Sequence, residues 1–203
     1  MNNIQKMNFR GEKSRETILN AAVKLLESKA FCKEPLIRDI AKTARVSDGS
    51  PNYYFGSKDN LINEAIYKLS DRWLETWFQL SRNLNLMPVE KIRVLCKNLG
   101  DFYAEHPNVI KISLNNDLFR GFKNSVRARF INEILIPITR EAVPKKTDDE
   151  IKTIVYSFAD TFDMTFLRAV SKHPDNSFNF FYKPNRDKFI DRLIDYSIVL
   201  LQS

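Results

Sequence analysis

The amino-acid sequence predicts an all-α protein in which a short N-terminal helical module precedes a larger helical bundle. Apolar residues recur three and four positions apart from the first expected helix to the last, and this spacing forms the apolar face of an α-helix. Alternation of apolar and polar residues, the pattern of a half-buried strand, appears nowhere over a useful length. Hydrophobic residues make up 43% of the 203 residues, which is enough to build a sizeable core.

Three short helices are expected near the N-terminus. Ser14 can cap the first, and the apolar stripe that follows begins at Ile18. Pro35 can open the second, because proline fits the first turn of a helix. Ser47 is the expected N-cap of the third, where Asp48 in the first turn complements the positive helix end.

Longer stretches follow, which bring the expected total to about nine helices. Ser57 can cap the fourth helix, and Pro88 can start the fifth. Pro137 is expected to kink the helix that contains it. The remaining helices are expected in part of 107–121 and at 122–142, 148–171 and 186–202.

Composition and charge narrow the functional classes. The formal net charge of +7 is compatible with a polyanionic partner but does not demonstrate one. Cys32 and Cys96 lack metal-ligand spacing, so no disulfide framework, metal site or cofactor is predicted. Residues 1–13 lack the apolar core of a signal peptide, and no apolar run approaches the roughly 18 residues that span a membrane. We therefore expect a cytoplasmic protein without a membrane partner.

Residues 47–58 carry the functional signal. Two short helices separated by three or four residues form a helix-turn-helix, whose second helix can lie in the major groove of DNA. Most side chains of this segment are polar or carry an aromatic hydroxyl, and such groups reach base edges and phosphates. The alternative is a polar surface turn between core helices, which the flanking helical pattern disfavours.

The order and spacing of four short pieces resembles the TetR (tetracycline repressor) family. The pieces, which together span about 48 residues, are Ile18-Leu19-x-Ala21-Ala22, Arg38-Asp39-Ile40-Ala41, Val46-Ser47-x-Gly49-Ser50 and Tyr54-Phe55-x-Ser57-Lys58-x-x-Leu61. The resemblance implies a bacterial, non-enzymatic regulator that binds double-stranded operator DNA as a homodimer and is nucleoid-associated when bound. It implies a DNA-binding domain at 1–56 and a ligand-binding and dimerisation domain at 57–203. Repression of a near-palindromic operator, relieved by a small ligand, is the family's commoner mode.

The resemblance also implies a set of DNA contacts. The predicted DNA-binding residues are Arg38, Ser47, Asp48, Ser50, Asn52, Tyr53, Tyr54 and Lys58. Lys58 is expected to contact a phosphate, and Asp48 and Asn52 are the candidates for base readout. For Arg38, a salt bridge to a nearby acidic residue remains an alternative. Four basic residues near the N-terminus, Lys6, Arg10, Lys13 and Arg15, could form an arm that adds phosphate contacts. The alternative is that this segment is an unstructured, solvated tail.

Three positions depart from the family pattern. Asn52 stands where a Tyr is common and could read adenine instead. Pro51 replaces an aliphatic residue, at the expected loss of about one backbone hydrogen bond. Arg45 stands where the turn normally has Gly, which costs roughly 1 kcal/mol if the position needs a positive φ. These departures are expected to alter the choice of operator.

A mostly apolar ligand pocket is expected between the bundle helices, for a small apolar or aromatic effector. The candidate lining residues are Trp73, Trp77, Phe102, Tyr103, Phe130, Phe158 and Phe162. Aromatic stripes at helical spacing are more often core, and that alternative stays open for each. His106 and His173 could belong to a metal-dependent site, but exposed loop histidines without a second ligand are the favoured interpretation.

The helices expected at 148–171 and 186–202 resemble the pair that forms the dimer interface in this family. The candidate interface residues are Phe158, Phe162, Leu193, Ile194, Leu200 and Leu201. A ligand-independent DNA-binding protein, whose bundle binds a protein partner, is the first alternative. A helical-bundle enzyme is the second, but the sequence offers no acid–base or metal cluster to support one.

Overall fold

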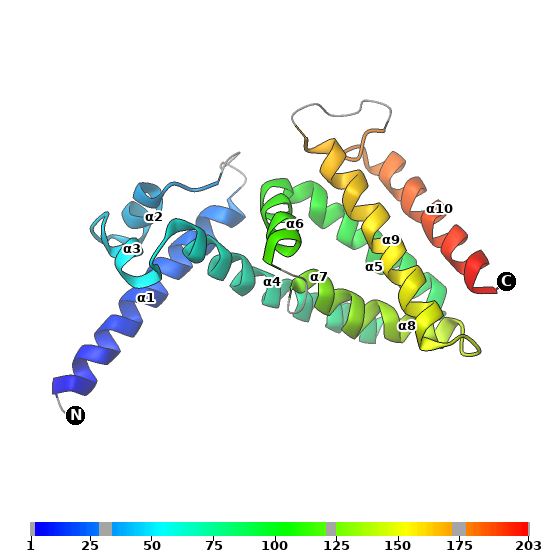
Figure 1. Cartoon of the computed structure of the whole chain (residues 1–203), viewed down its shortest axis with the longest axis horizontal. Helices are drawn as coiled ribbons and strands as arrows, with labels where there is room; N and C mark the ends of the chain where they lie inside the picture. Colours follow the sequence, from blue (N-terminus) through cyan, green and yellow to red (C-terminus); the bar gives the residue numbers. More distant parts are fainter. Residues whose placement is uncertain (1–2, 29–33, 121–124, 172–177, 203) are drawn as a thin grey trace. The chain divides into compact units, whose positions relative to one another are not determined.

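The computed structural model describes residues 3–28, 34–120, 125–171 and 178–202. Every regular element within these ranges is a helix (Figure 1), which confirms the predicted all-α class. Contacts divide the chain into two compact units, Met1–Asp71 and Arg72–Ser203, called unit 1 and unit 2 below. Within the same ranges no helix is both long and apolar enough to cross a membrane.

Unit 1 contains three helices and the beginning of a fourth, which are α1 (Asn3–Glu27), α2 (Ile37–Ala44), α3 (Ser50–Phe55) and α4 (Lys58–Asn83). The predicted start of the first helix at Ser14 is wrong, because α1 already includes that residue. The basic N-terminal segment is therefore helical from Asn3 and not an unstructured tail. The side chains of Lys6 and Arg10 lie outside the described residues.

The second helix also begins later than predicted. Pro35 precedes α2, and Leu36 has extended backbone angles of φ −83° and ψ 151°. The proline ends the preceding connection, and the first helical residue is Ile37. The apolar stripe that predicted these helices is buried, as the full burial of Ile18 and Ile40 shows. Periodicity thus located the core face, whereas the capping signals misplaced two helix starts.

The division between the units falls inside α4, whereas the expected domain boundary lies between residues 56 and 57. The first part of α4 remains with unit 1 because it completes that unit's core. Leu61 is fully buried, and Lys68 pairs with Glu16 of α1 at 3.4 Å. A functional boundary at 56/57 stays a prediction.

Unit 2 contains the remaining helices. They are α5 (Pro88–Glu105), α6 (Pro107–Arg120), α7 (Val126–Arg129), η1 (Phe130–Leu135), α8 (Ile136–Ala142), α9 (Asp148–Ala169) and α10 (Lys183–Gln202). Because α7, η1 and α8 follow one another directly, the described ranges contain nine helical stretches, as expected. A π-helical turn over η1 lies immediately before α8, and Pro137 occupies the first turn of α8. The kink expected at Pro137 stays a prediction.

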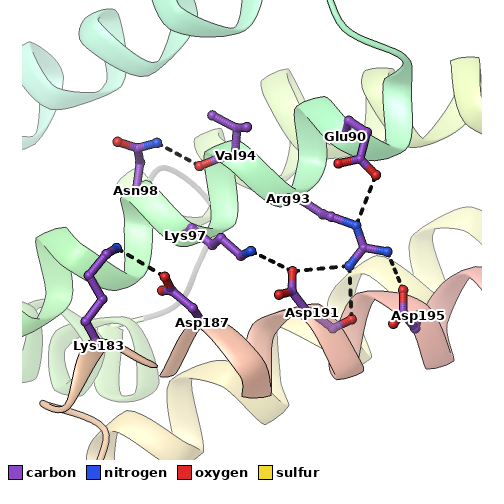
Figure 2. A network of polar contacts seen from close by, with 9 residues as sticks. All are labelled: Glu90, Arg93, Val94, Lys97, Asn98, Lys183, Asp187, Asp191 and Asp195. Atoms are coloured by element: carbon purple, nitrogen blue, oxygen red, sulfur yellow. Dashed lines mark hydrogen bonds and ion pairs between the residues drawn. The ribbon is translucent and has the colours of Figure 1, made fainter. Parts of the chain in front are cut away.

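The helices α9 and α10 run antiparallel and side by side, and α5 packs against α10 (Figure 1). A row of ion pairs joins α5 to α10 (Figure 2). Arg93 and Lys97 both reach Asp191, at 3.2 Å and 2.8 Å, and Arg93 also contacts Asp195. Partly exposed pairs contribute only about 0–1 kcal/mol each, so the row fixes the register of the two helices more than it stabilises them.

Gly100 allows α5 and α10 to approach closely. A Cβ at this position would lie 3.0 Å from Cδ of Arg186 and 3.0 Å from Cδ1 of Ile190. Both neighbouring side chains are themselves buried, so neither has free space into which it can move. The small size of Gly100 is therefore a packing requirement rather than a conformational one.

Replacing Gly100 with Ala is expected to lower the free energy of unfolding by about 1 kcal/mol. Overpacking costs about 1–3 kcal/mol, and the gain in helix propensity returns up to about 1 kcal/mol. Urea unfolding followed by helical circular dichroism measures the change. Gly11→Ala is the matched control, because a Cβ there meets nothing within 4 Å, and it should stabilise the chain by roughly 0.5–1 kcal/mol. Stabilisation by both variants would contradict the packing argument.

Candidate nucleic-acid interface

The turn between α2 and α3 depends on a left-handed residue. Arg45 has φ 57° and ψ 45°, which confirms that the position where the family has Gly requires a positive φ. Its amide donates to the carbonyl of Lys42 at 3.2 Å, and the amide of Val46 donates to the carbonyl of Ala41 at 3.0 Å. These two bonds form a Schellman motif, which satisfies the last carbonyls of α2. The exposed Arg45 therefore carries a conformational cost that glycine avoids.

The start of α3 differs from the prediction in two respects. The helix begins at Ser50 after Gly49, and Ser47 is not its N-cap. The hydroxyl of Ser47 instead lies 2.8 Å from that of Ser50. Pro51 consequently occupies the first turn, where its missing N–H has no intrahelical partner to lose. The predicted loss of a hydrogen bond is wrong for that reason.

The side chains predicted to contact DNA lie mainly on the solvent side of α2 and α3. Arg38, Asp48 and Asn52 are exposed, and Tyr53 is 83% exposed. The half-buried ring of Tyr54 packs edge-on against Tyr53, with ring centroids 5.1 Å apart. Exposure of a large aromatic side chain to this extent is unusual in a stable core helix, and it leaves the hydroxyl free to meet a partner.

Arg38 forms no ion pair with any described residue. The alternative salt bridge is therefore absent from the part of the chain that the structure describes. A guanidinium on the exposed side of α2 can bind a phosphate or a base edge. Its assignment to DNA stays a prediction.

One buried ring anchors α3 to the rest of unit 1. Phe55 at the end of α3 is 6% exposed, and the guanidinium of Arg15 lies over its ring, 4.4 Å from the centroid. The same guanidinium donates to both carboxylate oxygens of Glu64, at 2.7 Å and 2.6 Å. Arg15 thus joins α1, α3 and α4, and does not form part of a free basic arm. Its position three residues before the buried Ile18, on the same helix face, is the signal that could have indicated this role.

The junction between α3 and α4 is capped as predicted. Gly56 adopts φ 76°, and the hydroxyl of Ser57 accepts a hydrogen bond from the amide of Asn60 at 3.2 Å. The side chain of Asn60 donates back to the carbonyl of Phe55 at 3.2 Å. These contacts confirm Ser57 as the N-cap and fix the first turn of α4.

Lys58, the predicted phosphate contact, has an acidic partner within the chain. Its Nζ lies 2.9 Å from Oε1 of Glu34, and both side chains are about one-third exposed. A carboxylate and a phosphate compete for the same ammonium group. Binding of Lys58 to a phosphate therefore requires this pair to open or to share the charge.

The aromatic residues predicted to line a pocket pack against one another in the core of unit 2. The seven residues Trp73, Trp77, Phe102, Tyr103, Phe130, Phe158 and Phe162 all belong to one cluster or pack against it. Trp73 and Phe102, for example, have ring centroids 4.1 Å apart. A cavity of about 30 Å³ lies beside this cluster and is lined by Ile92, Leu135, Thr139, Ile154, Val155, Phe158, Ile194, Ser197 and Ile198. Of the seven predicted residues only Phe158 lines it, so the cavity wall is mainly aliphatic.

The histidines and cysteines contribute no metal site to the described residues. His106 stacks on Trp73, with ring centroids 5.4 Å apart, and His173 lies outside the described residues. Burial raises the pKa of the Cys96 thiol to about 12, so this cysteine is an unreactive core residue. No group of three or more His, Cys, Asp or Glu side chains in the described ranges could hold a metal ion.

Three of the predicted dimer-interface residues are buried in the core of unit 2. Phe158, Phe162 and Ile194 are 8%, 1% and 2% exposed, because the core of a single chain already buries them. Leu193 is half-buried, Leu200 is 62% exposed, and the side chain of Leu201 lies outside the described residues. The exposed apolar residues of α9 and α10 are Met164, Tyr196, Val199 and Leu200. Of these four, only Leu200 was among the predicted interface residues.

A buried polar network crosses the aromatic core. The Tyr103 hydroxyl donates to Oδ1 of Asp163 at 2.9 Å, and Arg127 binds Asp163 and Asp160. Burial raises the pKa of Asp117, which lies close to this network, to about 6. Sequence reasoning missed these residues, because nothing in the local pattern distinguishes them from surface charges on their helices.

The comparisons with known proteins agree with the helix-turn-helix. Residues 18–65 match the model of the family described as bacterial regulatory proteins, tetR family. A stretch of 110 residues is 28% identical to the HTH-type transcriptional repressor NicS of Pseudomonas putida. That match covers 54% of this chain and 51% of the repressor, so it spans about half the length of the curated relative.

Two solved structures resemble nearly the whole chain. A TetR-like transcriptional regulator from Rhodococcus sp. RHA1 is 18% identical, with coverage of 92% of this chain and 96% of that one and a TM-score of 0.60. Thermus thermophilus FadR, a TetR family transcriptional repressor in complex with lauroyl-CoA, is 24% identical, with 93% coverage of each chain and a TM-score of 0.59. At these identities the likeness establishes the fold, including the helical domain that follows the helix-turn-helix.

Arg45→Gly is expected to raise the free energy of unfolding of unit 1 by about 1 kcal/mol, because glycine adopts the left-handed conformation without the Cβ clash. Arg45→Ala removes the same charge but keeps the Cβ, so it should not reproduce the gain. Thermal unfolding of both variants beside the parent chain measures the difference. Equal stability of the two variants would mean that the turn does not strain Arg45.

Proposed function

We propose that this chain, which belongs to the tetR family of bacterial regulatory proteins through its N-terminal unit, is a homodimeric repressor that a small apolar effector releases from a near-palindromic operator. Regulators of this family are DNA-binding proteins and not enzymes. The observation that carries the proposal is the exposed face of α3, held on a three-helix scaffold. The repressor would act on chromosomal DNA in the cytoplasm.

The α3 side chains suit two kinds of DNA contact. An exposed asparagine amide can donate to and accept from the edge of one adenine, so Asn52 is proposed to read a base. Ser47, Ser50 and the two tyrosine hydroxyls can bind phosphates or bases, and Asp48 can accept from a cytosine amino group. Arg38 and Lys58 would supply charge at the backbone.

A second copy of the chain is proposed to cover the exposed apolar face of α9 and α10. Tyr196, Val199 and Leu200 are 69%, 62% and 62% exposed and lie on one face of α10, because residues three and four positions apart are neighbours on a helix. Met164 adds an apolar side chain from α9. Clustered exposed apolar groups mark interaction surfaces, and a two-fold pairing would place two recognition helices about 34–36 Å apart, one turn of DNA.

The effector is proposed to bind in unit 2. A ligand can release DNA only if it binds the two conformations of the repressor with different affinities. The mainly aliphatic cavity beside the aromatic core, which at about 30 Å³ is too small for an effector, would enlarge around an apolar group. The lauroyl-CoA complex of the Thermus thermophilus repressor supports an apolar ligand for this fold.

DNA readout and phosphate binding can be separated by substitution. Asn52→Ala should relax base choice at one position of each half-site, at a cost of about 1–3 kcal/mol on the preferred operator. Tyr54→Phe combined with Lys58→Ala should weaken binding to all duplexes and lower the salt slope by about 1 for each phosphate that the variant no longer binds. Selection from a randomised duplex library, followed by gel-shift titration over salt, measures both effects.

Glu34→Gln should have the opposite effect on affinity to the Lys58 variant. It releases Lys58 from its acidic partner and should strengthen binding to every duplex. Unchanged affinity in the Asn52 and Lys58 variants would overturn the assigned roles. Failure to select any duplex would overturn the function itself.

Val199→Glu is expected to convert the dimer to a monomer, because it places a charge at the centre of the proposed interface. Val199 is exposed in the single chain, so folding should be preserved. Sedimentation equilibrium measures the mass, and circular dichroism the fold. Tyr67→Glu is the control: Tyr67 is 52% exposed but belongs to α4 in unit 1, outside α9 and α10. A dimeric Val199→Glu chain would show that another surface forms the contact.

A further inference from the structure

We propose that unit 2 binds the protonated amine of an otherwise apolar effector through the carboxylate of Asp117. The inference rests on the proposed function as a ligand-released repressor and names the chemical class of the ligand. It assigns a cationic group to a helical domain whose solved neighbour is described in complex with an anionic acyl-CoA.

Asp117 is a buried acid with an unused acceptor. The residue lies near the end of α6 and is only 5% exposed. Its Oδ2 is inaccessible and accepts no hydrogen bond from any described residue, although the Ser125 side chain hydrogen-bonds to the carboxyl group. The great majority of buried polar atoms in proteins have a partner. An unpaired buried acceptor is costly, and a ligand that donates to it explains its presence.

The charges around Asp117 are unbalanced in favour of a cation. Arg127 already binds both Asp163 and Asp160, so among the residues that the structure describes here one guanidinium faces three carboxylates. Tyr103 donates its hydroxyl to Asp163 and brings no positive charge. An ammonium group would donate to the free oxygen of Asp117 and supply the missing charge.

The alternatives to an ammonium group fit the site less well. A metal ion needs several ligands, and no described cluster of His, Cys, Asp and Glu could provide them. A carboxylate or phosphate ligand would face the three aspartates and be repelled. Protonation of Asp117, whose pKa burial raises to about 6, competes with a bound cation increasingly as the pH falls.

The surroundings of the network favour an apolar, ring-bearing ligand body. Tyr103 packs edge-on against Phe162 and Phe166, with ring centroids 5.1 Å and 5.0 Å apart. Aromatic rings attract a nearby ammonium group as well as burying apolar surface. Among the described helices of unit 2, α6 packs chiefly on α5, and a shift of α6 would be needed to admit a ligand beside Asp117.

Three probes of similar shape test the charge. The probes are 2-phenylethylamine, 3-phenylpropanoate and 2-phenylethanol, and the amine is cationic at pH 7.5 because alkylamines titrate near the lysine pKa of about 10.4. Melting curves of the full chain measure binding without DNA. The amine should raise the melting temperature more than the other two probes. Asp117→Asn should reduce its apparent affinity about 10- to 100-fold, and Asp149→Asn, at an exposed position of α9, should leave it unchanged.

Asp117→Asn has a second readout that separates a binding role from a structural one. Without ligand at pH 8, the variant should melt at a higher temperature than the parent chain, because it removes a buried charge whose Oδ2 accepts no hydrogen bond from a described residue. A lower melting temperature would mean that the carboxylate is held by partners. That result overturns the proposal. So does a melting shift with 3-phenylpropanoate that equals or exceeds the shift with the amine, an amine shift that persists in Asp117→Asn, or the absence of a shift with all three probes.

The same samples distinguish this inference from the proposed function. If the selected operator is released by lauroyl-CoA but the amine has no effect on melting or on DNA, the repressor function stands and the role of Asp117 is overturned. If no duplex is bound, the repressor function fails, while the melting shifts still decide whether Asp117 binds an amine.

Discussion

The contact of Arg15 with Phe55 and Glu64 is the constraint on which the DNA-binding unit depends. A helix of six residues is far too short to be stable by itself, so α3 must be held by side chains from neighbouring helices. Phe55 supplies the apolar contact, and the guanidinium over its ring fixes that contact to α1 and α4. The polar face of α3 can stay exposed because Phe55, the last residue of the helix, is anchored in this way.

In unit 2, apolar packing and polar binding are divided between different residues. The tryptophans and phenylalanines fill the core, where their loss would create cavities. The polar network of Tyr103, Arg127 and Asp163 crosses that core and is largely satisfied by its own members. Asp117 lies beside this network, and its Oδ2 accepts no hydrogen bond from a described residue. A domain can thus diverge in ligand choice through a few buried polar positions while its helices keep their packing.

The sequence predicted what depends on local periodicity and spacing. The all-α class, the start of α5 at Pro88 and the cap at Ser57 are confirmed, because each follows from neighbouring residues in the chain. The caps expected at Ser14 and Ser47 are wrong, since a serine signals only a possible helix start and tertiary packing decides between candidates. The buried Phe158 and Ile194 show the same limit. An apolar stripe reveals that a face is covered, but not whether its own chain or a second one covers it.

If Lys58 binds a phosphate as proposed, its ion pair with Glu34 affects how the protein searches the chromosome. Because the Glu34 carboxylate already pairs with Lys58, a phosphate contact of Lys58 replaces one ionic contact with another. Non-specific binding to DNA therefore gains little free energy from this lysine. Residence on unrelated sequence becomes shorter, and more of the protein stays free to reach its proper site. Only where several further contacts form together does the exchange become favourable. An acidic residue that touches no base can in this way sharpen the ratio of specific to non-specific occupancy.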